Sequence, residues 1–147
     1  MAPIFLRFTR LPASIRSLAI RSIKPFHSSA RCLDVYKDVN LDTFTKLTQT
    51  NHRLVLVDFY ADWCGPCHQL SPILEKLCSD PNIKSGIGGL PVDLIKVDVE
   101  SDVGGSLGQQ HKVTSLPTVF AYREGKPVSH FRGAIPQNAV LEFLKAV

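Results

Sequence analysis

The stretch LVLVDFYADWCGPC, residues 54–67, decides the fold that we expect for this chain. Its first seven residues are apolar or aromatic except for one aspartate, and such a run is typical of a central strand covered on both faces. After a short turn that contains Trp63, two cysteines separated by Gly65 and Pro66 begin a segment whose apolar residues recur at helical spacing. The cysteine pair is therefore expected where a buried strand passes into a helix.

The spacing of Cys64 and Cys67 places both side chains on one face of that helix. Residues three apart in a helix have Cβ atoms about 5–6 Å apart, and a disulfide needs ~3.8 Å, so a small adjustment of the first turn permits a bond. The unpaired N–H groups and the helix dipole at this end favour the thiolate of Cys64, the form that attacks disulfides. We expect the more buried Cys67 to resolve the mixed disulfide, with Gly65 and Pro66 tuning the pair because proline limits backbone freedom.

The other segments predict an α/β chain built around a mixed sheet. The expected strands are residues 33–37, 54–60, 93–99, 118–123 and 127–132; the expected helices are one that follows Asn40, then residues 64–79 and 136–146, with a weak helical turn around 102–110. Residues 80–92 contain glycine and proline and predict an irregular loop. This order implies parallel crossovers first, an antiparallel hairpin last, and helices on both faces of the sheet.

Composition and charge exclude several classes of protein. The chain has 147 residues, 44% of them hydrophobic, which fits one folded domain, and no stretch of about 18 residues is free of charge, so we expect no membrane-spanning helix. The net charge of +4 comes from the N-terminus, because six of the 17 basic residues and none of the 13 acidic residues precede Asp34. The remainder is slightly acidic and gives no general electrostatic basis for binding nucleic acid.

Residues 1–32 have the pattern of an organellar targeting segment that is cleaved to leave a folded domain, residues 33–147. On a helical wheel, four basic residues fall opposite a set of apolar ones; the basic set is Arg7, Arg10, Arg21 and Lys24. Serines are frequent, acidic residues are absent and no long apolar core exists, which favours a transit peptide over a secretory signal. We expect cleavage between about His27 and Asp34; a basic tail that binds acidic surfaces is the alternative.

The segment WCGPC after VLVDFYAD resembles the active-site segment of thioredoxins. The similarity extends over nearly all of residues 34–147 through further markers, which are Asp58, Pro72, Leu116-Pro117-Thr118, Gly125 and Gly133-Ala134. Together with residues 1–32, the chain is similar to mitochondrial precursors of this family.

The resemblance implies the thioredoxin fold and a protein-disulfide reductase that cycles a Cys64–Cys67 disulfide in cell redox homeostasis. It implies electrons from NADPH through thioredoxin reductase, with no metal and no organic cofactor bound to this chain. Disulfide-containing proteins such as peroxiredoxins would be substrates, and the protein would act as a monomer in the mitochondrial matrix.

Asp58 and Lys96 are candidate proton-transfer residues. Asp58 interrupts an apolar strand, where loss of solvation should raise the pKa of its carboxyl group. The resemblance implies that Asp58 acts as a general acid and base toward Cys67 through water, with Lys96 of the adjacent strand nearby. The alternatives are a capped or solvent-facing aspartate and a solvent-facing lysine.

Pro117 would be unfavourable inside a central ladder because it lacks an N–H group. The resemblance implies a cis Leu116–Pro117 bond, which would bring the backbone of Ser115 and Leu116 beside the cysteines, free to pair with an extended substrate. The residues expected to bind substrate around the cysteines are Trp63, Ser115, Leu116, Pro117, Thr118, Gly133 and Ala134, with Pro66 at the edge. A trans proline and a Trp63 packed in the core are the alternatives.

Other classes of function remain open on the residues alone. Cys64 to His68 match the c-type haem attachment pattern, although the only methionine is Met1. Cys64, Cys67, His68 and Cys78 would suffice for zinc on paper, but we expect Cys78 in the core. A non-catalytic binding module would keep the same fold, and an oxidant or isomerase usually carries histidine between its cysteines. Cys32 is assigned no role.

Overall fold

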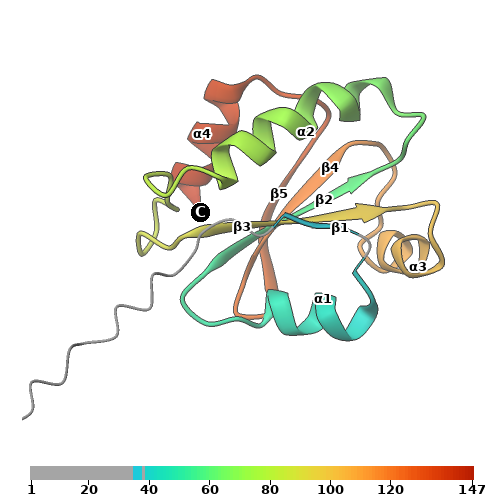
Figure 1. Ribbon diagram of the computed structural model, residues 1–147, viewed down its shortest axis with the longest axis horizontal. Coiled ribbons are helices and arrows are strands. Elements are labelled where there is room, and N and C mark those ends of the chain that lie inside the picture. The colour runs from blue at the N-terminus through green and yellow to red at the C-terminus, as the bar shows by residue number, and fades with distance from the viewer. Residues whose placement is uncertain (1–34, 38) are drawn as a thin grey trace, which may run out of the picture.

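A five-stranded mixed sheet forms the centre of the computed structural model, which describes residues 35–37 and 39–147 (Figure 1). The elements are β1 (Val35–Lys37), α1 (Leu41–Thr48), β2 (Leu54–Tyr60), α2 (Gly65–Cys78), β3 (Val92–Asp98), α3 (Asp102–Gln110), β4 (Thr118–Arg123), β5 (Lys126–Arg132) and α4 (Gln137–Ala146). The expected transit peptide, its cleavage region and Cys32 lie outside the described residues.

The strand order is β1-β3-β2-β4-β5, with β2 at the centre. β3 pairs in parallel with both β1 and β2, whereas β2 with β4 and β4 with β5 are antiparallel. The predicted mixed sheet, with parallel crossovers first and a hairpin last, is confirmed. β2 occupies the predicted residues. Both of its faces are covered, and only a continuous apolar run such as residues 54–60 can be buried on both sides.

Helices cover both faces of the sheet. In Figure 1, α2 and α4 lie on one face and α1 and α3 on the other. Leu54, Leu56 and Leu94 pack with α2 and α4, while Val55, Val57 and Phe59 belong to the cluster that includes Phe44 of α1 and Leu107 of α3; the period of two along β2 therefore divides its side chains between two cores.

α3 is a complete helix of nine residues where the sequence predicted only a weak turn. Its three glycines lower helix propensity, but the side chain of Ser101 accepts a hydrogen bond from the Gly104 N–H and caps the helix. A Cβ on Gly104 would lie 1.8 Å from the Asp98 carbonyl oxygen, so the absence of a side chain lets the helix start close to the end of β3. Packing here outweighs propensity. A smaller difference is that Pro136 is the N-cap of α4 rather than its first helical residue.

The loop of residues 80–91 is irregular, as predicted, and it is held against the end of α4. Lys84 and Pro91 form an isolated antiparallel bridge. The N–H groups of Gly86 and Ile87 donate hydrogen bonds of 2.8 and 3.0 Å to the carbonyl oxygens of Leu144 and Val147. These bonds satisfy carbonyls that the last turn of a helix leaves without an intrahelical partner.

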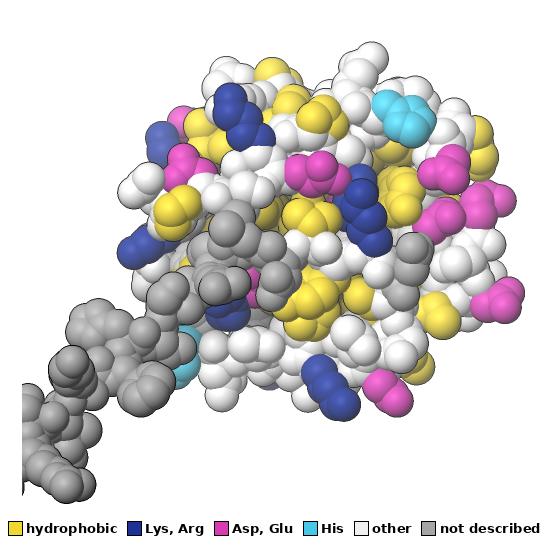
Figure 2. Space-filling model, in the orientation of Figure 1, with side chains coloured by type: hydrophobic (Ala, Val, Ile, Leu, Met, Phe, Trp, Pro, Cys, Tyr) yellow, Lys and Arg dark blue, Asp and Glu magenta, His cyan; other side chains and the backbone are white. Residues whose placement is uncertain are grey.

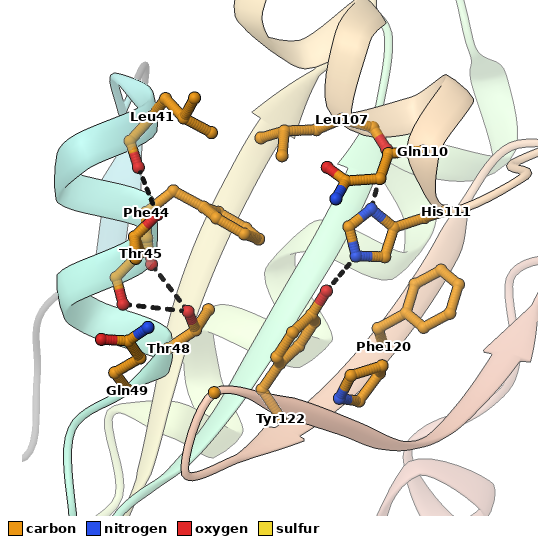
Figure 3. Close-up of a pocket in the computed structure, with 12 residues that line it drawn as sticks. Leu41, Phe44, Thr45, Thr48, Gln49, Leu107, Gln110, His111, Phe120 and Tyr122 are labelled. Carbon is orange, nitrogen blue, oxygen red and sulfur yellow. Dashed lines mark hydrogen bonds between the residues drawn. The ribbon is translucent and has the colours of Figure 1, made fainter.

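The α1 and α3 face contains a cavity of about 490 Å³ away from the cysteines. Figure 3 shows Phe44 from α1, His111 after α3 and Tyr122 from β4 directed toward one another, with a hydrogen bond between the ring of His111 and the hydroxyl of Tyr122. Burial raises the pKa of Tyr122 to about 12, so its hydroxyl stays neutral. None of the expected site residues lines this cavity.

Charge on the visible face of the molecule is mixed. Figure 2 shows basic side chains spaced singly, whereas acidic side chains gather at the edge where α3 lies in Figure 1. This distribution agrees with the slight excess of acidic residues after residue 33. No helix within residues 35–37 and 39–147 combines the length and the apolar character that crossing a bilayer requires.

Replacement of a core leucine on α2 should destabilise the protein far more than the same replacement on the surface. Leu74 is fully buried, so Leu74→Ala should lower the free energy of unfolding by ~2–5 kcal/mol through lost burial and a residual cavity. Leu41, exposed on α1, is the matched control, and Leu41→Ala should cost less than about 1 kcal/mol. Urea unfolding of the two variants measures both values, and equal losses would contradict the two-layer core described above.

Candidate active site

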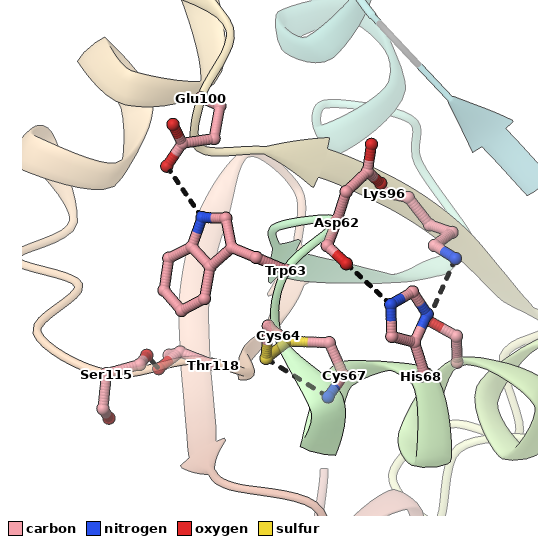
Figure 4. The surroundings of a disulfide bond; sticks show 10 residues. Asp62, Trp63, Cys64, Cys67, His68, Lys96, Glu100, Ser115 and Thr118 are labelled. Carbon is pink, nitrogen blue, oxygen red and sulfur yellow. Dashed lines mark hydrogen bonds between the residues drawn. A yellow bond between two sulfur atoms is a disulfide. The ribbon is translucent and has the colours of Figure 1, made fainter.

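The two cysteines lie at the N-terminus of α2 and form a disulfide (Figure 4). Their Cα atoms are 5.3 Å apart. Cys64 is the N-cap residue and Cys67 lies in the first turn, as expected from the strand-to-helix position of the motif. The residues are 4% and 2% exposed, so the expected difference in burial is small in the disulfide form.

The helix terminus surrounds Cys64 with donors. The Cys67 N–H lies 3.2 Å from the sulfur of Cys64, and the N–H groups of Cys67 and His68 also reach the Cys64 carbonyl oxygen. An N-cap side chain that accepts an N–H bond is stabilised as an anion by that bond and by the helix dipole. The arrangement therefore favours thiolate at Cys64 once the disulfide is reduced.

Asp58 is buried in β2, in register with Lys96 of β3 and Val119 of β4. It is 1% exposed, and neither carboxylate oxygen has a hydrogen-bond partner among the described residues. Burial raises its pKa from 3.8 to about 7; the positive charge of Lys96 opposes this rise and the negative charge of Glu75 adds to it. The alternative of a capped or solvent-facing aspartate is wrong.

Lys96 is also buried, at 7% exposure, so the alternative of a solvent-facing lysine is wrong. Its ammonium group donates to Ser71 Oγ at 3.0 Å and to Glu75 Oε1 at 3.2 Å, both on α2, and it lies 4.9 Å from the centre of the Tyr60 ring. Ser71 and Glu75 were not identified from the sequence as residues of the site. The feature that could have identified them is their spacing of four residues from Cys67 and from each other, which places Cys67, Ser71 and Glu75 on one face of α2.

Trp63 lies on the surface beside the disulfide and is 71% exposed, which rules out the alternative of core packing. Its indole N–H donates to Glu100 Oε1 at 3.2 Å, and Figure 4 shows the ring extending away from the cysteines toward Glu100. Gly65 and Pro66 are exposed as well. The disulfide therefore lies just below a surface that an approaching protein could contact.

The segment around Pro117 completes this surface. The Leu116–Pro117 bond is cis, as expected. The side chain of Leu116 packs against the cluster formed by Ala61, Cys64 and Cys67. The hydroxyl of Thr118 donates to the Ser115 carbonyl oxygen at 2.7 Å, and the Gly133 N–H donates to the Pro117 carbonyl oxygen, also at 2.7 Å. Gly133 has φ +83°, a conformation that favours glycine, and the exposed Ala134 follows it.

A groove of about 380 Å³ opens beside the disulfide, between Trp63 and α3. Its lining residues are Trp63, Val99, Gly105, Gly108, Gln109, Val113, Thr114, Ser115 and Leu116. The sequence identified three of these as site residues and missed those contributed by α3, because the glycines of α3 carry no side chain whose chemistry suggests a surface for contact.

The four residues considered as zinc ligands from the sequence do not come together in the structure. Cys78 belongs to the α2 and α4 core, whereas Cys64 and Cys67 form a separate cluster with Ala61. The ring of His68 is exposed and its Nε2 lies 2.7 Å from the Asp62 carbonyl oxygen. Within the part of the chain that the structure describes, no three or more histidine, cysteine or acidic side chains form a group that could hold a metal ion.

A disulfide at a helix N-terminus, a buried carboxyl group in the preceding strand and an exposed groove define a dithiol–disulfide oxidoreductase. Residues 35–146 match the family model for thioredoxin. The chain belongs to the thioredoxin family, and its Cys64–Cys67 pair occupies the active-site position of a protein-disulfide reductase.

Similar proteins agree with this assignment. A thioredoxin of Mycoplasmoides gallisepticum is 36% identical over 100 residues, which covers 68% of this chain and 89% of that protein. The oxidised mitochondrial thioredoxin 3 of Saccharomyces cerevisiae superposes with a TM-score of 0.61 at 29% identity, covering 77% of this chain and 95% of the other. A chain from a structural study of thiol resolution in yeast mitochondrial 1-Cys peroxiredoxin via glutathione and thioredoxin systems superposes with a TM-score of 0.62 at 28% identity, covering 78% and 96%.

The burial of Asp58 predicts how stability depends on pH. Below pH 3.8 the carboxyl is protonated in both folded and unfolded states; as the pH rises toward about 7, the unfolded chain loses this proton while the folded protein keeps it, so stability falls. Asp58→Asn removes the effect. In the oxidised protein it should therefore raise the free energy of unfolding, relative to wild type, by roughly 2–4 kcal/mol more at pH 8 than at pH 4.

Comparing two pH values cancels any cost of the new amide that does not depend on pH. Asp62→Asn, at an exposed position two residues before Cys64, is the control and should show almost no difference between the two pH values. Denaturant unfolding measures all three proteins. A pH-independent effect of Asp58→Asn would contradict a buried, protonated carboxyl group.

Proposed function

We propose that this protein is a mitochondrial thioredoxin, made as a precursor, that reduces protein disulfides in the matrix with electrons from NADPH through thioredoxin reductase. The observation that carries the proposal is the Cys64–Cys67 pair at the start of α2, together with Asp58 buried in the strand that precedes it. No metal or organic cofactor of this chain is needed for the reaction, because the two sulfurs hold both electrons.

Cys64 is the nucleophile in this proposal and Cys67 the resolving residue. The Cys64 thiolate attacks one sulfur of the substrate disulfide, forms a mixed disulfide and releases the other substrate sulfur as a thiolate. The thiolate of Cys67 then attacks the Cys64 sulfur, closes the disulfide seen in the structure and releases the second substrate thiolate. Two electrons pass to the substrate, and its two thiolates take up protons from solvent. Support comes from the N–H group directed at the Cys64 sulfur.

Asp58 is the proposed proton-transfer residue. Cys67 must lose a proton before it attacks, and a carboxylate can take it, through water, if its pKa is close to the working pH. The pKa of Asp58, raised by burial to about 7, meets this condition, whereas an exposed aspartate would be a weaker base. Lys96 lies in register with Asp58 on the adjacent strand, and its positive charge limits how far burial raises the pKa of the Asp58 carboxyl group.

The proposed docking surface consists of the exposed and backbone groups around the disulfide. An extended substrate segment would contact Trp63 and Pro66, pair with the backbone of Ser115 and Leu116, and lie along the Gly133 and Ala134 turn. Pro117 and Thr118 hold this backbone in place, which the hydrogen bonds from Gly133 and Thr118 support. The groove between Trp63 and α3 would take the apolar side chains of the substrate.

The proposed partners are thioredoxin reductase and disulfide-containing proteins such as peroxiredoxins, with the protein acting as a monomer. Similarity to a chain from the study of yeast mitochondrial 1-Cys peroxiredoxin supports the second of these. A matrix location is supported by the composition of residues 1–32 and by similarity to the mitochondrial thioredoxin 3 of yeast. Residues 33–147 would be the mature domain.

Removing the resolving sulfur should trap substrates covalently. With Cys67→Ser, the mixed disulfide on Cys64 cannot be resolved, so protein adducts that dithiothreitol releases should accumulate on a non-reducing gel. Cys64→Ser should form no such adducts and should lower reductase-coupled disulfide reduction at least ~1,000-fold. A non-catalytic binding module would form no adducts with either variant, and that result would refute the proposed chemistry.

Import into mitochondria should remove the N-terminal segment. The mature protein isolated from the matrix should begin between about His27 and Asp34. Replacing Arg7, Arg10, Arg21 and Lys24 with Gln removes the basic face of the segment and should leave the precursor uncleaved outside the organelle. N-terminal sequencing and fractionation measure both results. A mature chain that retained Arg7 would contradict the assignment of residues 1–32.

A further inference from the structure

The ammonium group of Lys96 lies beside Asp58 without forming a hydrogen bond to it. The two residues are in register on the adjacent parallel strands β3 and β2, so their side chains leave the same face of the sheet, toward α2. The ammonium donates to Ser71 Oγ and Glu75 Oε1, while both oxygens of Asp58 lack a hydrogen-bond partner in the described part of the chain.

We propose that Ser71 and Glu75 are positioning residues that hold the ammonium of Lys96 against α2 and thereby withhold it from the carboxyl group of Asp58. The proposal deepens the function proposed above, because it explains how the proton-transfer role of Asp58 is maintained. It concerns where the charge of Lys96 is held, and it does not require Ser71 or Glu75 to touch the reacting sulfurs.

The geometry of α2 makes this possible. Ser71 and Glu75 lie four and eight residues after Cys67, so successive turns of one helix face present a sulfur, a hydroxyl and a carboxylate. The Lys96 ammonium meets the hydroxyl and the carboxylate at 3.0 and 3.2 Å, and the ring of Tyr60 lies 4.9 Å away as a further favourable contact for a cation. The hydroxyl, the carboxylate and the ring therefore stabilise the ammonium group of Lys96 in a position away from direct contact with Asp58.

The groups that face Asp58 come from three elements. β3 contributes Lys96, α2 contributes Glu75, and β4 contributes the apolar Val119 in register with Asp58. A lysine in direct contact with a buried carboxylate commonly lowers its pKa by 1–3 units. Such a contact would keep Asp58 ionised at neutral pH and make it a poorer base for the proton of Cys67.

The test measures the charge of Asp58 itself. In the oxidised full chain, the carboxyl carbon of Asp58 is titrated by NMR after selective labelling and is assigned by its loss in Asp58→Asn. Glu75→Gln should move the midpoint down by about half a unit to one unit, because it removes a nearby negative charge and weakens the hold on Lys96. Ser71→Ala, a milder change, should move it in the same direction by less.

The control Glu142→Gln makes the same change on α4, where Glu142 forms an exposed pair with Lys145 at 3.3 Å. It should leave the Asp58 midpoint within about 0.1 unit of wild type, because solvent and salt screen so exposed a charge. Thermal unfolding of each variant confirms that the comparison is made between folded proteins.

A second background separates an effect through Lys96 from a direct effect of the Glu75 charge. In Lys96→Met, only the direct effect remains, so Glu75→Gln should shift the midpoint less than half as far as it does with Lys96 present. An equal shift in both backgrounds, or an unchanged or raised midpoint in Glu75→Gln, would overturn the proposal.

The reductase assay keeps this result distinct from the proposed role of Asp58. If Asp58→Asn leaves the pH profile of disulfide reduction unchanged, the proton-transfer role fails, while the NMR titration still decides how Lys96 is held. If Asp58 transfers the proton and Glu75 also positions Lys96, the pH at which disulfide reduction is half-maximal should follow the NMR midpoint in Glu75→Gln. In Glu142→Gln it should remain at the wild-type value.

Discussion

Complete coverage of β2 by helices on both faces is the constraint on which the site depends. The strand needs a continuous apolar sequence to be covered in this way, and the same coverage leaves Asp58, the one charged side chain of that strand, only 1% exposed to bulk solvent. The same strand leads through a short turn into α2, so the cysteines begin a helix that lies over the face on which Asp58 is buried. Fold and chemistry therefore have a common origin in one strand.

Burial of an ionisable group is costly unless the group is paired and hydrogen-bonded, and the buried ammonium group of Lys96 meets this condition. Lys96 is satisfied by Ser71 and Glu75, and Glu75 remains partly exposed to solvent. The carboxyl group of Asp58 is the exception, without a hydrogen bond from the described residues. Natural proteins retain such exceptions where function requires them, at the expense of stability.

Local patterns allowed much of this molecule to be predicted. The run at residues 54–60 and the cysteine spacing place the central strand, the helix start and the redox pair, because each depends on neighbours in the chain. The cis bond before Pro117 followed from family resemblance and not from the residues alone. α3 was underestimated because packing overrides the low propensity of its glycines. Ser71 and Glu75 were missed because their partner, Lys96, lies more than twenty residues away in sequence.

Trp63 is the only tryptophan of the chain, and it lies exposed at the mouth of the groove, with its indole N–H bonded to Glu100. The intrinsic fluorescence of the protein is therefore dominated by a single fluorophore located where partners are proposed to dock. When tryptophan is excited selectively over the three tyrosines, the emission reports on this surface, with no contribution from a tryptophan in the core. Association of an unlabelled partner can thus be followed optically in the native sequence, without introducing a dye beside the disulfide.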